Sequence, residues 1–439
     1  MNVMIFNRKI EVIFTKEDEL ILDGQSKICN WLYNHLLEMT IKDYKENNND
    51  KKLLTGRNLR NQVPILKQEF IFLYSVHSSP LKNTAIRLKE TYKKFFNNET
   101  GYPKFKSWKK HWFSLYYDEP NKGFKLIENK NLQITLGINK ENKRIKVIGK
   151  LKENLNLRNT DKIKNFRLCK QQGNKFYAIF CIERKDIDKK ETNKWIAIDQ
   201  NHKNFFVAID NTGVSYEFEK LPQIKYWDKV IDEIKSKRDL CSRKSKLIET
   251  GTGRSYYLPS KRWTKLNNAL DNAYHKRREQ IKSSCYSIAN WIAKNYDYVA
   301  IGDYTPSLNT ATYDNMHRSM LNQEIIGEFR NILKWVMERS GKHYSKVDEK
   351  DTTKTCCICG NKEKKDPHIR EFTCQKCKTK LSRDINSSIN IAKKDKLLSG
   401  SDYVDWDLYN STYTAKWNFK KSKILFTGHT LEKSNIWMN

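Results

Sequence analysis

The sequence lacks any run of about 20 consecutive apolar residues, the length that a helix needs to span a bilayer, so we expect no membrane partner. The N-terminal residues 1–6 are too soon interrupted by charge to form a secretory signal. Acidic residues are also scarce, with 51 Asp and Glu against 83 Lys and Arg and a net charge of +32. Hydrophobic residues make up 38% of the chain, which excludes wholesale disorder and allows a packed core.

The positive charge is spread along nearly the whole chain instead of being confined to one tail. Such a distribution suits a polyanion lying across a folded body, and it favours nucleic acid over a merely soluble basic protein. An AT-rich genome would explain the preference for Lys over Arg, but it would not explain the excess of basic over acidic residues. The length of 439 residues predicts about 2–4 compact units.

The ten cysteines do not form the pattern of a disulfide framework. Half of them cluster between 356 and 377, and the others are widely separated. We expect these separated residues to be reduced core residues of an intracellular protein. They are Cys29, Cys169, Cys181, Cys241 and Cys285.

Two cysteine pairs, Cys356-x-x-Cys359 and Cys374-x-x-Cys377, have the spacing of a zinc ribbon. Each pair places two thiolates within reach of one tetrahedral ion, and the alternative is a chance cluster of buried cysteines. Cys357 breaks the two-residue gap, so we do not expect it to be a ligand. A closed shell of four thiolates has no open position, and the predicted zinc site is therefore structural.

The first half of the chain predicts helices followed by strands. Residues 1–15 alternate weakly as a strand does, residues 16–100 have apolar residues at helical spacing, and residues 112–185 contain several short strand patterns. Residues 46–52 are polar and predict a loop. In the segment 101–110 aromatic residues alternate with lysines, so it is either a nucleic-acid contact or a solvated loop. The candidate contact residues there are Lys104, Phe105, Lys106 and Trp108.

From residue 195 the pattern changes to buried strands. Residues 195–199 form a strand pattern that ends in Asp199, and two further strand patterns with tight turns follow by residue 218. Three consecutive antiparallel strands with an acid on the first are how RNase H-like folds begin. Further along we expect helices at 224–248, 261–295 and 321–340 and strands at 298–301 and 344–348; we assign no structure after about 400.

A closed zinc site leaves catalysis to other residues, and carboxylates are the first candidates. Hydrolysis of a phosphodiester bond needs an activated water and a stabilised leaving oxygen, which two divalent ions supply together. Asp199 is one candidate ligand, and Asp384, at the start of a predicted helix after the cysteines, is a second. Asn386 and Asn390 lie one turn apart on that helix, where they could hold a water or a carboxylate. Taken singly, each acid is better explained as an ordinary surface charge.

Together these features resemble a known family. The order of these features resembles that of TnpB, the transposon-encoded OMEGA nuclease. The features are a strand ending in Asp, two helices, a strand, a zinc ribbon and the segment 383–391. They resemble equally the Fanzor proteins and the miniature type V CRISPR effectors. The similarity covers about 80–405. The Gly-Tyr-Pro-Lys-Phe-Lys segment at 101–106 and the segment 352–356 resemble motifs of the family.

The sequence departs from this family at the second catalytic acid. The family usually has Glu in a Glu-Asp-Leu motif after the central strand, whereas this chain has Gly302-Asp303-Tyr304. Either the nuclease is inactive, or the acid comes from elsewhere, as the resemblance to Fanzor proteins implies. The matching residue is Glu349, which lies 46 positions after Asp303 at the end of a predicted strand. We favour an active, rearranged site of Asp199, Glu349 and Asp384, with Asp303 as a lesser candidate ligand and otherwise a turn residue.

The resemblance implies an α+β multidomain fold: a helical recognition lobe and a small β-barrel, followed by an RNase H-like (RuvC) α/β domain with an inserted zinc ribbon. Residues 1–15 would be the first strand of the β-barrel (wedge) domain, residues 16–110 the helical recognition domain, and residues 111–190 the rest of the wedge domain. The RuvC nuclease domain would then be split into a first segment at 191–350 and a second at 381–400, with the zinc ribbon at 351–380 between them and a tail at 401–439.

The resemblance also implies an RNA-guided DNA endonuclease that uses guide-RNA pairing and a short target-adjacent motif. Its cofactors would be two Mg²⁺ ions, one structural Zn²⁺ and the guide RNA, and its partners that RNA and double-stranded target DNA. We expect a monomeric protein within a ribonucleoprotein, in the nucleus of a eukaryotic or virus-infected host or in a bacterial cytoplasm or nucleoid. The alternatives are an RNA-guided DNA-binding protein without nuclease activity and a DNA transposase that acts without RNA.

Overall fold

The computed structural model describes residues 3–46, 56–139, 141–171, 174–185, 192–201, 203–242, 244–249, 255–304, 326–364, 366, 369–398, 412–418, 421 and 423–428. The chain divides into two compact units, Met1–Asp186 and Ile187–Asn439. None of the helices in the described part of the chain is long and apolar enough to span a membrane. Except for residue 46, the loop predicted at 46–52 lies outside the described residues.

The first unit contains an antiparallel sheet of seven strands, in the order β2-β6-β7-β1-β5-β4-β3. The first strand pairs with β7 over most of its length and with β5 only at its end, so it joins the two halves of the sheet. No strand pairing among the described residues links β2 to β3, so the expected barrel is present as an open sheet. The strands are β1 (Val3–Ile13), β2 (Leu115–Tyr117), β3 (Phe124–Ile127), β4 (Asn131–Ile138), β5 (Arg144–Leu151), β6 (Lys162–Gln171) and β7 (Lys175–Lys185).

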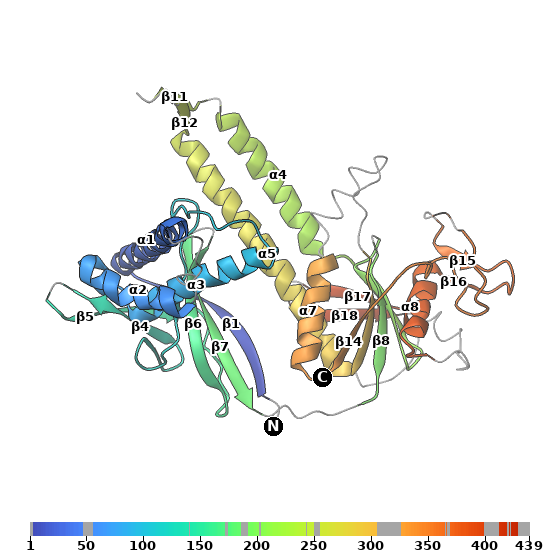
Figure 1. The fold of residues 1–439 in the computed structure, drawn as a ribbon. Helices are drawn as coiled ribbons and strands as arrows, with labels where there is room; N and C mark the ends of the chain where they lie inside the picture. The colour runs from blue at the N-terminus through green and yellow to red at the C-terminus, as the bar shows by residue number, and fades with distance from the viewer. Residues whose placement is uncertain are drawn as a thin grey trace. The chain divides into compact units, whose positions relative to one another are not determined.

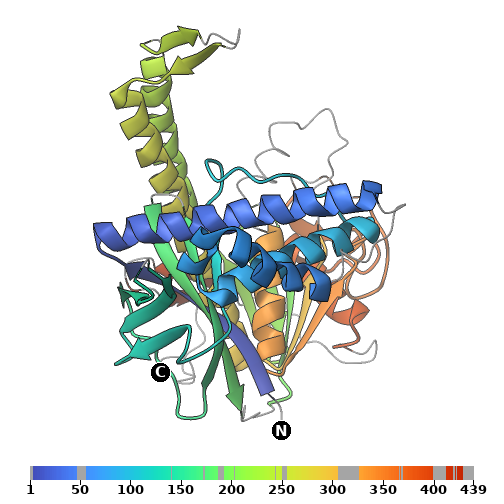
Figure 2. The same cartoon turned by 60° about the vertical axis from the view of Figure 1, so that its left-hand side comes forward.

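The helices of the first unit are α1 (Lys16–Glu46), α2 (Gly56–Glu69), the 3-10 helix η2 (Ile71–Ser75) and α3 (Ser78–Phe96). The hydroxyl of Thr15 accepts a hydrogen bond from the Asp18 N–H at the start of α1, and three acids in the first turn complement the helix dipole. Both α1 and α2 pack on α3, and Figure 2 shows the three helices lying across one another. One continuous hydrophobic core joins these helices to the sheet.

The second unit is built on another sheet of seven strands, in the order β14-β13-β8-β9-β10-β17-β18 (Figure 1). Strands β8, β9 and β10 are antiparallel neighbours, as predicted, and β13 and β14 continue the sheet parallel to β8. The strands are β8 (Trp195–Asp199), β9 (Phe206–Asp210), β10 (Ser215–Phe218), β13 (Tyr298–Gly302), β14 (His343–Val347), β17 (Thr412–Asn418) and β18 (Lys423–Gly428).

Four helices among the described residues accompany this sheet: α4 (Pro222–Ser242), α5 (Lys261–Asn295), α7 (Ile326–Arg339) and α8 (Arg383–Lys394). Apolar residues of α5 and α7 share one core with the strands, and residues of α8 share a second core with them. The predicted helix at 224–248 is too long, because α4 ends at Ser242. The chain then forms a hairpin of β11 (Lys246–Glu249) and β12 (Ser255–Leu258), whose residues at 247–248 and 256–258 favour strand.

The C-terminal region also has more structure than we expected. Strand β17 lies parallel to β10, and β18 pairs antiparallel with β17 at the edge of the sheet. The alternating residues Tyr413, Ala415 and Trp417 face the core, with Ala415 fully buried. This alternation over only a few residues is the sequence signal for the strand.

Candidate active site and zinc site

The first predicted acid, Asp199, is the last residue of β8, a strand in which every residue is buried. Only 4% of Asp199 is exposed. On the neighbouring strand β13, Ile301 pairs with Ile198, so Gly302 is the next residue alongside Asp199. Gly302 in turn pairs with Val347, the last residue of β14. The three parallel strands therefore end side by side, with Gly302 in the middle.

Glu349 follows β14 by two residues and folds back over the end of β13. A Cβ atom built on Gly302 would lie 1.6 Å from Glu349 Oε1 and 2.3 Å from its Cδ. The carboxylate therefore occupies the space where a side chain at position 302 would begin. Its Oε1 is buried and has no hydrogen-bond partner among the described residues.

The third predicted acid, Asp384, is the second residue of α8 and is 8% exposed. The helix begins directly after β16 (Lys380–Ser382), which pairs with β15 (Glu371–Thr373). At this junction the N–H of Arg383 donates to the carbonyl of Arg370, at 2.8 Å. The Arg370 side chain also approaches Asp384 Oδ1 to 3.9 Å. The start of α8, and with it Asp384, is thus held by the segment that contains the cysteines.

The charges of two of the acids act on the third, Asp199. Burial raises the pKa of Asp199 well above its usual value, and the nearby charges of Glu349 and Asp384 raise it further. Burial and the charge of Asp303 raise the pKa of Glu349 to about 7. Burial raises the pKa of Asp384, although neighbouring basic side chains oppose the shift. Carboxylates in this state need a cation to be ionised together, so the residues fit a Mg²⁺ site.

The oxygens of these acids are less tightly grouped than the cysteine sulfurs. Among the described residues, only the four cysteines have ligand atoms that all lie within 4.8 Å of one another. A wider group of carboxylates fits two ions about 3.5–4 Å apart, because each acid can then bind either one ion or both.

Two hydroxyl groups that were not predicted from the sequence connect the acids. Ser387 Oγ, on α8, lies 3.0 Å from both Asp199 Oδ1 and Thr352 Oγ1. The Thr352 hydroxyl donates to the carbonyl of Glu349 at 2.9 Å. The signal for Ser387 was its position three residues after Asp384, on the same helical face. These contacts join the parts of the chain that carry all three acids.

Asp303, the lesser candidate, lies beside the cluster and holds its backbone. Its Oδ1 accepts a hydrogen bond from the N–H of Glu349 at 3.1 Å, and its own N–H donates to the Val347 carbonyl. From α7, Arg330 donates to the carbonyl of Tyr304 at 2.7 Å. These contacts fix the turn after β13 against the turn after β14. Asp303 therefore positions Glu349 in this structure.

The four predicted zinc ligands do meet. The Sγ atoms of Cys356 and Cys377 are 3.6 Å apart, as are those of Cys359 and Cys374, and all four thiols are free. Four sulfurs at about 2.3 Å from a tetrahedral zinc ion would be about 3.8 Å apart, so the arrangement fits zinc. Cys357 lies outside the group, and burial raises the pKa of its thiol to about 12.

Each cysteine pair closes in the same kind of turn. The Gly360 N–H donates to the Cys356 carbonyl, and the Lys378 N–H donates to the Cys374 carbonyl, both at 3.0 Å. Gly360 has a φ of 72° and Lys378 a φ of 60°, both in the left-handed region. The first turn has glycine, which adopts this conformation without strain. The second has a lysine, whose Cβ makes the same conformation strained.

The two asparagines of α8 hold the backbone before the cysteines, and their hydrogen bonds to described residues go to backbone groups and not to a carboxylate. The amide groups of Asn386 and Asn390 both donate to the carbonyls of Thr352 and Thr355. The Asn386 oxygen accepts from the Cys357 N–H at 2.9 Å. These contacts differ from the role that we expected, and they attach α8 to the segment between Glu349 and the zinc site.

In the first unit, the predicted contact segment 101–110 runs along α1. Phe105 is 59% exposed and Lys104 is exposed. Lys106 instead lies over the ring of Tyr33, 3.9 Å from its centre, and burial lowers its pKa to about 8. Trp108 is half-buried and donates to a side chain of α1 at 3.1 Å. Of the four candidate contact residues, only Lys104 and Phe105 are thus presented to solvent.

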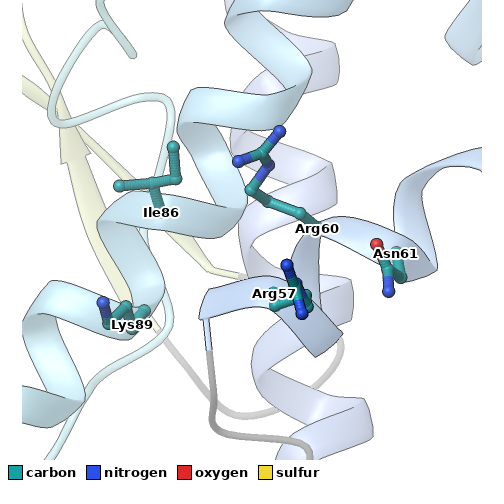
Figure 3. A pocket seen from close by; sticks show the side chains of 5 residues that line it. All are labelled: Arg57, Arg60, Asn61, Ile86 and Lys89. Atoms are coloured by element: carbon teal, nitrogen blue, oxygen red, sulfur yellow. The ribbon is translucent and has the colours of Figure 1, made fainter.

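A cationic cavity of about 500 Å³ lies between α2 and α3. Figure 3 shows its lining: Arg57, Arg60 and Asn61 from α2 and Ile86 and Lys89 from α3. Lys89 has an exposed ion pair with the neighbouring Glu90, whereas neither arginine has an ion pair with a described acid. This concentration of unbalanced positive charge suits a phosphate group. No sequence pattern predicted the cavity, because its two helices come from separate segments.

Comparison with known proteins agrees with this architecture. Residues 327–391, from α7 to α8, match the family described as Cas12f1-like, TNB domain, and this segment includes Glu349 and Asp384. A protein of Acanthamoeba polyphaga mimivirus named "Putative transposase R186" is 30% identical over 140 residues, which make up 30% of this chain and only 27% of that protein.

The cryo-EM structure of a Cas12f1–sgRNA–target DNA complex has a similar fold. Its TM-score is 0.59 at 15% sequence identity, and the alignment covers 87% of this chain and 84% of that one. The chain therefore has a mixed α/β fold resembling that of Cas12f1, with a four-cysteine cluster that fits a zinc ribbon.

Proposed function

We propose that this protein is an RNA-guided DNA endonuclease with one RNase H-like (RuvC) active site formed by Asp199, Glu349 and Asp384. The observation that carries the proposal is the position of the Glu349 carboxylate over Gly302, beside the end of β8. The usual family motif would place a Glu at position 302. Glu349 supplies a carboxylate at the end of that strand from the segment that follows β14.

In this proposal the protein's own residues hold two Mg²⁺ ions and align a DNA strand beside them. When bound, the ions activate the attacking water and stabilise the leaving oxygen. Asp199 and Asp384 act as ligands from a strand end and a helix start, and Ser387 orients Asp199. Asp199 and Asp384 are buried and Glu349 is half-buried, and the Asp303 and Ser387 contacts hold these residues, so the ligand positions are set before substrate arrives.

The proposal assigns target recognition to a guide RNA. Three observations support nucleic-acid binding: the net charge of +32, the exposed Lys104 and Phe105, and the cationic cavity between α2 and α3. The solved relative with a TM-score of 0.59 holds both an sgRNA and a target DNA. Base pairing would select the sequence, and the first unit would grip the nucleic-acid backbone and read the target-adjacent motif.

The four cysteines hold a structural zinc ion in this proposal. Their thiolates close its coordination shell, so the ion would have no position free for substrate. Its effect on catalysis is indirect, because the cysteine segment is bonded to α8 at Arg370 and Cys357. The zinc site therefore keeps Asp384 and Glu349 in register with the sheet.

The decisive experiment compares Glu349→Gln with Asp348→Asn in protein purified with its bound RNA. That RNA is sequenced, a matching duplex DNA is prepared, and cleavage is measured with Mg²⁺. We expect Glu349→Gln to lower the rate by at least about a hundredfold, because the metal loses a charged ligand, and the exposed Asp348→Asn to leave it unchanged. Equal cleavage by the wild type and Glu349→Gln would refute the assignment of Glu349.

The two alternatives predict different results in the same experiment. A nuclease-inactive, RNA-guided DNA-binding protein would retain the RNA and bind the duplex without cutting it. A transposase that acts without RNA would purify free of RNA and would bind no RNA tightly.

A further inference from the structure

The helices α4 and α5 leave the sheet of the second unit as an antiparallel pair (Figures 1 and 2). The C-terminal half of α5, from Ile281 to Ala293, is part of the core that α5 shares with the strands. Its N-terminal half packs on α4 in a separate small cluster that includes Trp227 and Leu270. We call α4, α5 and the β11–β12 hairpin between them the arm.

The arm extends past the edge of the sheet that carries the acids. Helix α5 ends at Asn295 and β13 begins at Tyr298, so α5 runs back along the sheet antiparallel to β13. The acids follow the C-terminal ends of β8 and β14, which are parallel to β13. From Ile281 to its start at Lys261, α5 rises about 30 Å. The hairpin thus lies well beyond the acid-bearing edge.

The hairpin exposes apolar side chains on both faces. Leu247 pairs with Tyr257 on one face, and Ile248 pairs with Tyr256 on the other. Tyr256 and Tyr257 are 53% and 70% exposed, and Leu247 and Leu258 are each 49% exposed. A two-stranded ribbon is only marginally stable alone, and exposed apolar side chains on it favour association. The ribbon is therefore suited to a partner that covers its tyrosines.

The surroundings of the hairpin are strongly basic. Within 244–249 and 255–265, Glu249 is the only acid. No ion pair within the described residues neutralises the exposed basic side chains there. These side chains are Lys244, Lys246, Lys261, Arg262 and Lys265. Aromatic faces next to unpaired cations are the combination that binds single-stranded nucleic acid, by base stacking and by phosphate contacts.

We propose that the β11–β12 hairpin binds the single-stranded DNA that continues past the acid-bearing edge from the phosphate being cut, with Tyr256 and Tyr257 stacking on its unpaired bases. This inference rests on the proposed nuclease function, which places a DNA strand at the acids. The arm leaves the sheet on the side of the acids, where the strand must continue. A second copy of the chain is a poor partner for the hairpin, because two such basic hairpins repel each other.

Photo-crosslinking tests this contact directly. The complete protein, with its bound RNA, is irradiated with an oligodeoxythymidine that contains iododeoxyuridine, in buffer without magnesium. We expect crosslinks to Tyr256 or Tyr257, located by mass spectrometry. Omitting magnesium prevents cleavage, so the result does not depend on nuclease activity. Crosslinks confined to other parts of the chain, with none on the hairpin, would overturn the proposal.

A binding experiment measures the contribution of the tyrosines. The double variant Tyr256→Ala/Tyr257→Ala should bind a fluorescein-labelled oligodeoxythymidine at least about tenfold more weakly, the effect of losing one stacked base. The measurement is made at raised salt, which weakens the electrostatic background. The Tyr256→Phe/Tyr257→Phe variant keeps the ring faces and should bind normally. Tyr226→Ala, at an exposed tyrosine of α4, is the matched control and should also bind normally.

The outcomes separate this inference from the proposed function. Unchanged DNA binding by the double Ala variant, or loss of the bound RNA with DNA binding intact, would refute the hairpin contact. A change in oligomeric state, measured by light scattering, would assign the hairpin to a protein interface instead. If Glu349→Gln leaves cleavage unchanged while the double Ala variant still weakens DNA binding, the proposed active site fails and the hairpin contact stands.

Discussion

The carboxylate of Glu349 and the missing side chain of Gly302 occupy the same space at the end of β13. The two residues come from neighbouring parallel strands, and their backbones are held together by Asp303. Position 302 must therefore remain a glycine for as long as position 349 supplies the acid. The glycine at position 302 and the glutamate at position 349 therefore depend on each other.

Gly302→Ala should abolish most of the cleavage activity. The new methyl group would lie 1.6 Å from the present position of Glu349 Oε1, so the carboxylate must move away from the site. We expect a loss of about a hundredfold or more, measured by cleavage of target DNA. Gly327→Ala on α7 is the control, because a Cβ atom there meets nothing within 4 Å. Equal losses in both variants would show that the effect is not specific to the site.

The double variant Gly302→Glu/Glu349→Ala should recover part of the activity that each single change removes. It moves the carboxylate to the strand end itself, and Glu349→Ala vacates the space that the new side chain needs. We expect at least about tenfold more cleavage than with Glu349→Ala alone. If the double variant is no more active than that single variant, the two positions are not equivalent.

The stability of the magnesium-free protein should fall as the pH rises. Folding raises the pKa of Glu349 from 4.5 to about 7, through burial and the charge of Asp303. A raised carboxyl pKa favours the folded state while the group is protonated, so this contribution is complete below about pH 4.5 and is lost as the pH rises through 7. We expect Tm to decrease between about pH 5 and pH 8. The free energy of unfolding should fall by at most about 3 kcal/mol over this range.

Glu349→Gln should flatten this pH dependence, whereas the exposed Asp348→Asn should change it much less, because the Asp348 charge contributes less than burial and Asp303 to the raised pKa of Glu349. Added Mg²⁺ should raise Tm more at pH 8 than at pH 5, because the ion binds the ionised carboxylates. Identical pH profiles for the wild type and Glu349→Gln would contradict the assignment of the shift to this residue.

Cys359→Ser should release zinc, whereas Cys357→Ala should retain it. Cys359 belongs to the group of four sulfurs and Cys357 does not. We expect zinc content, measured by mass spectrometry of the metal, to fall only in the first variant. Cleavage should fall with it, by about tenfold or more, because α8 and the Glu349 segment are bonded to the cysteine segment. Full zinc content in Cys359→Ser would exclude that cysteine as a ligand.

Lys378→Gly should stabilise the zinc ribbon. Lys378 has a φ of 60°, and a side chain in this region costs about 1 kcal/mol relative to glycine. We expect tighter zinc retention in a competition with a chelator, by up to about fivefold. Gly360→Ala, at the equivalent turn of the other cysteine pair, should have the opposite effect. Weaker zinc retention by Lys378→Gly would show that the lysine makes a contact that outweighs the strain.

Reversal of two charges in the cationic cavity should weaken nucleic-acid binding. For Arg57→Glu/Arg60→Glu we expect the slope of log affinity against log salt to become shallower by about 1.5, because two phosphate contacts are lost. Lys16→Glu/Lys42→Glu is the control with the same change in net charge, at lysines that already pair with acids. Equal slopes for both variants would show that only total charge matters.

Sequence patterns predicted the features of the site that are local in the chain. The strand that ends at Asp199, the helix that begins near Asp384 and the two cysteine pairs all have short-range signals: a buried run, a helical period and a fixed spacing. The family resemblance added the choice of Glu349. No local pattern shows that Glu349 lies over position 302, because that contact depends on the pairing of β13 with β14.

The features that we missed depend on contacts between distant segments. The sequence singles out no role for Ser387, and for Asn390 it predicts a water or a carboxylate as partner; only the packed structure shows that they reach Asp199 and Thr355. The strands β11 and β17 are short: β11 has only two adjacent apolar residues next to lysines, and β17 has an alternation of only a few residues, so composition favoured helix or loop there. Their pairing with other strands overcame this weak preference.

The position of β17 has a consequence for how the protein is made. This strand lies next to β10 in the sheet, although about 200 residues separate them in the chain. During synthesis β10 leaves the ribosome long before its neighbour, with its edge unpaired and Phe218 and Tyr216 not yet covered from that side. An unpaired apolar edge is where growing chains aggregate, so we expect chaperones to bind the nascent chain until the final strands emerge.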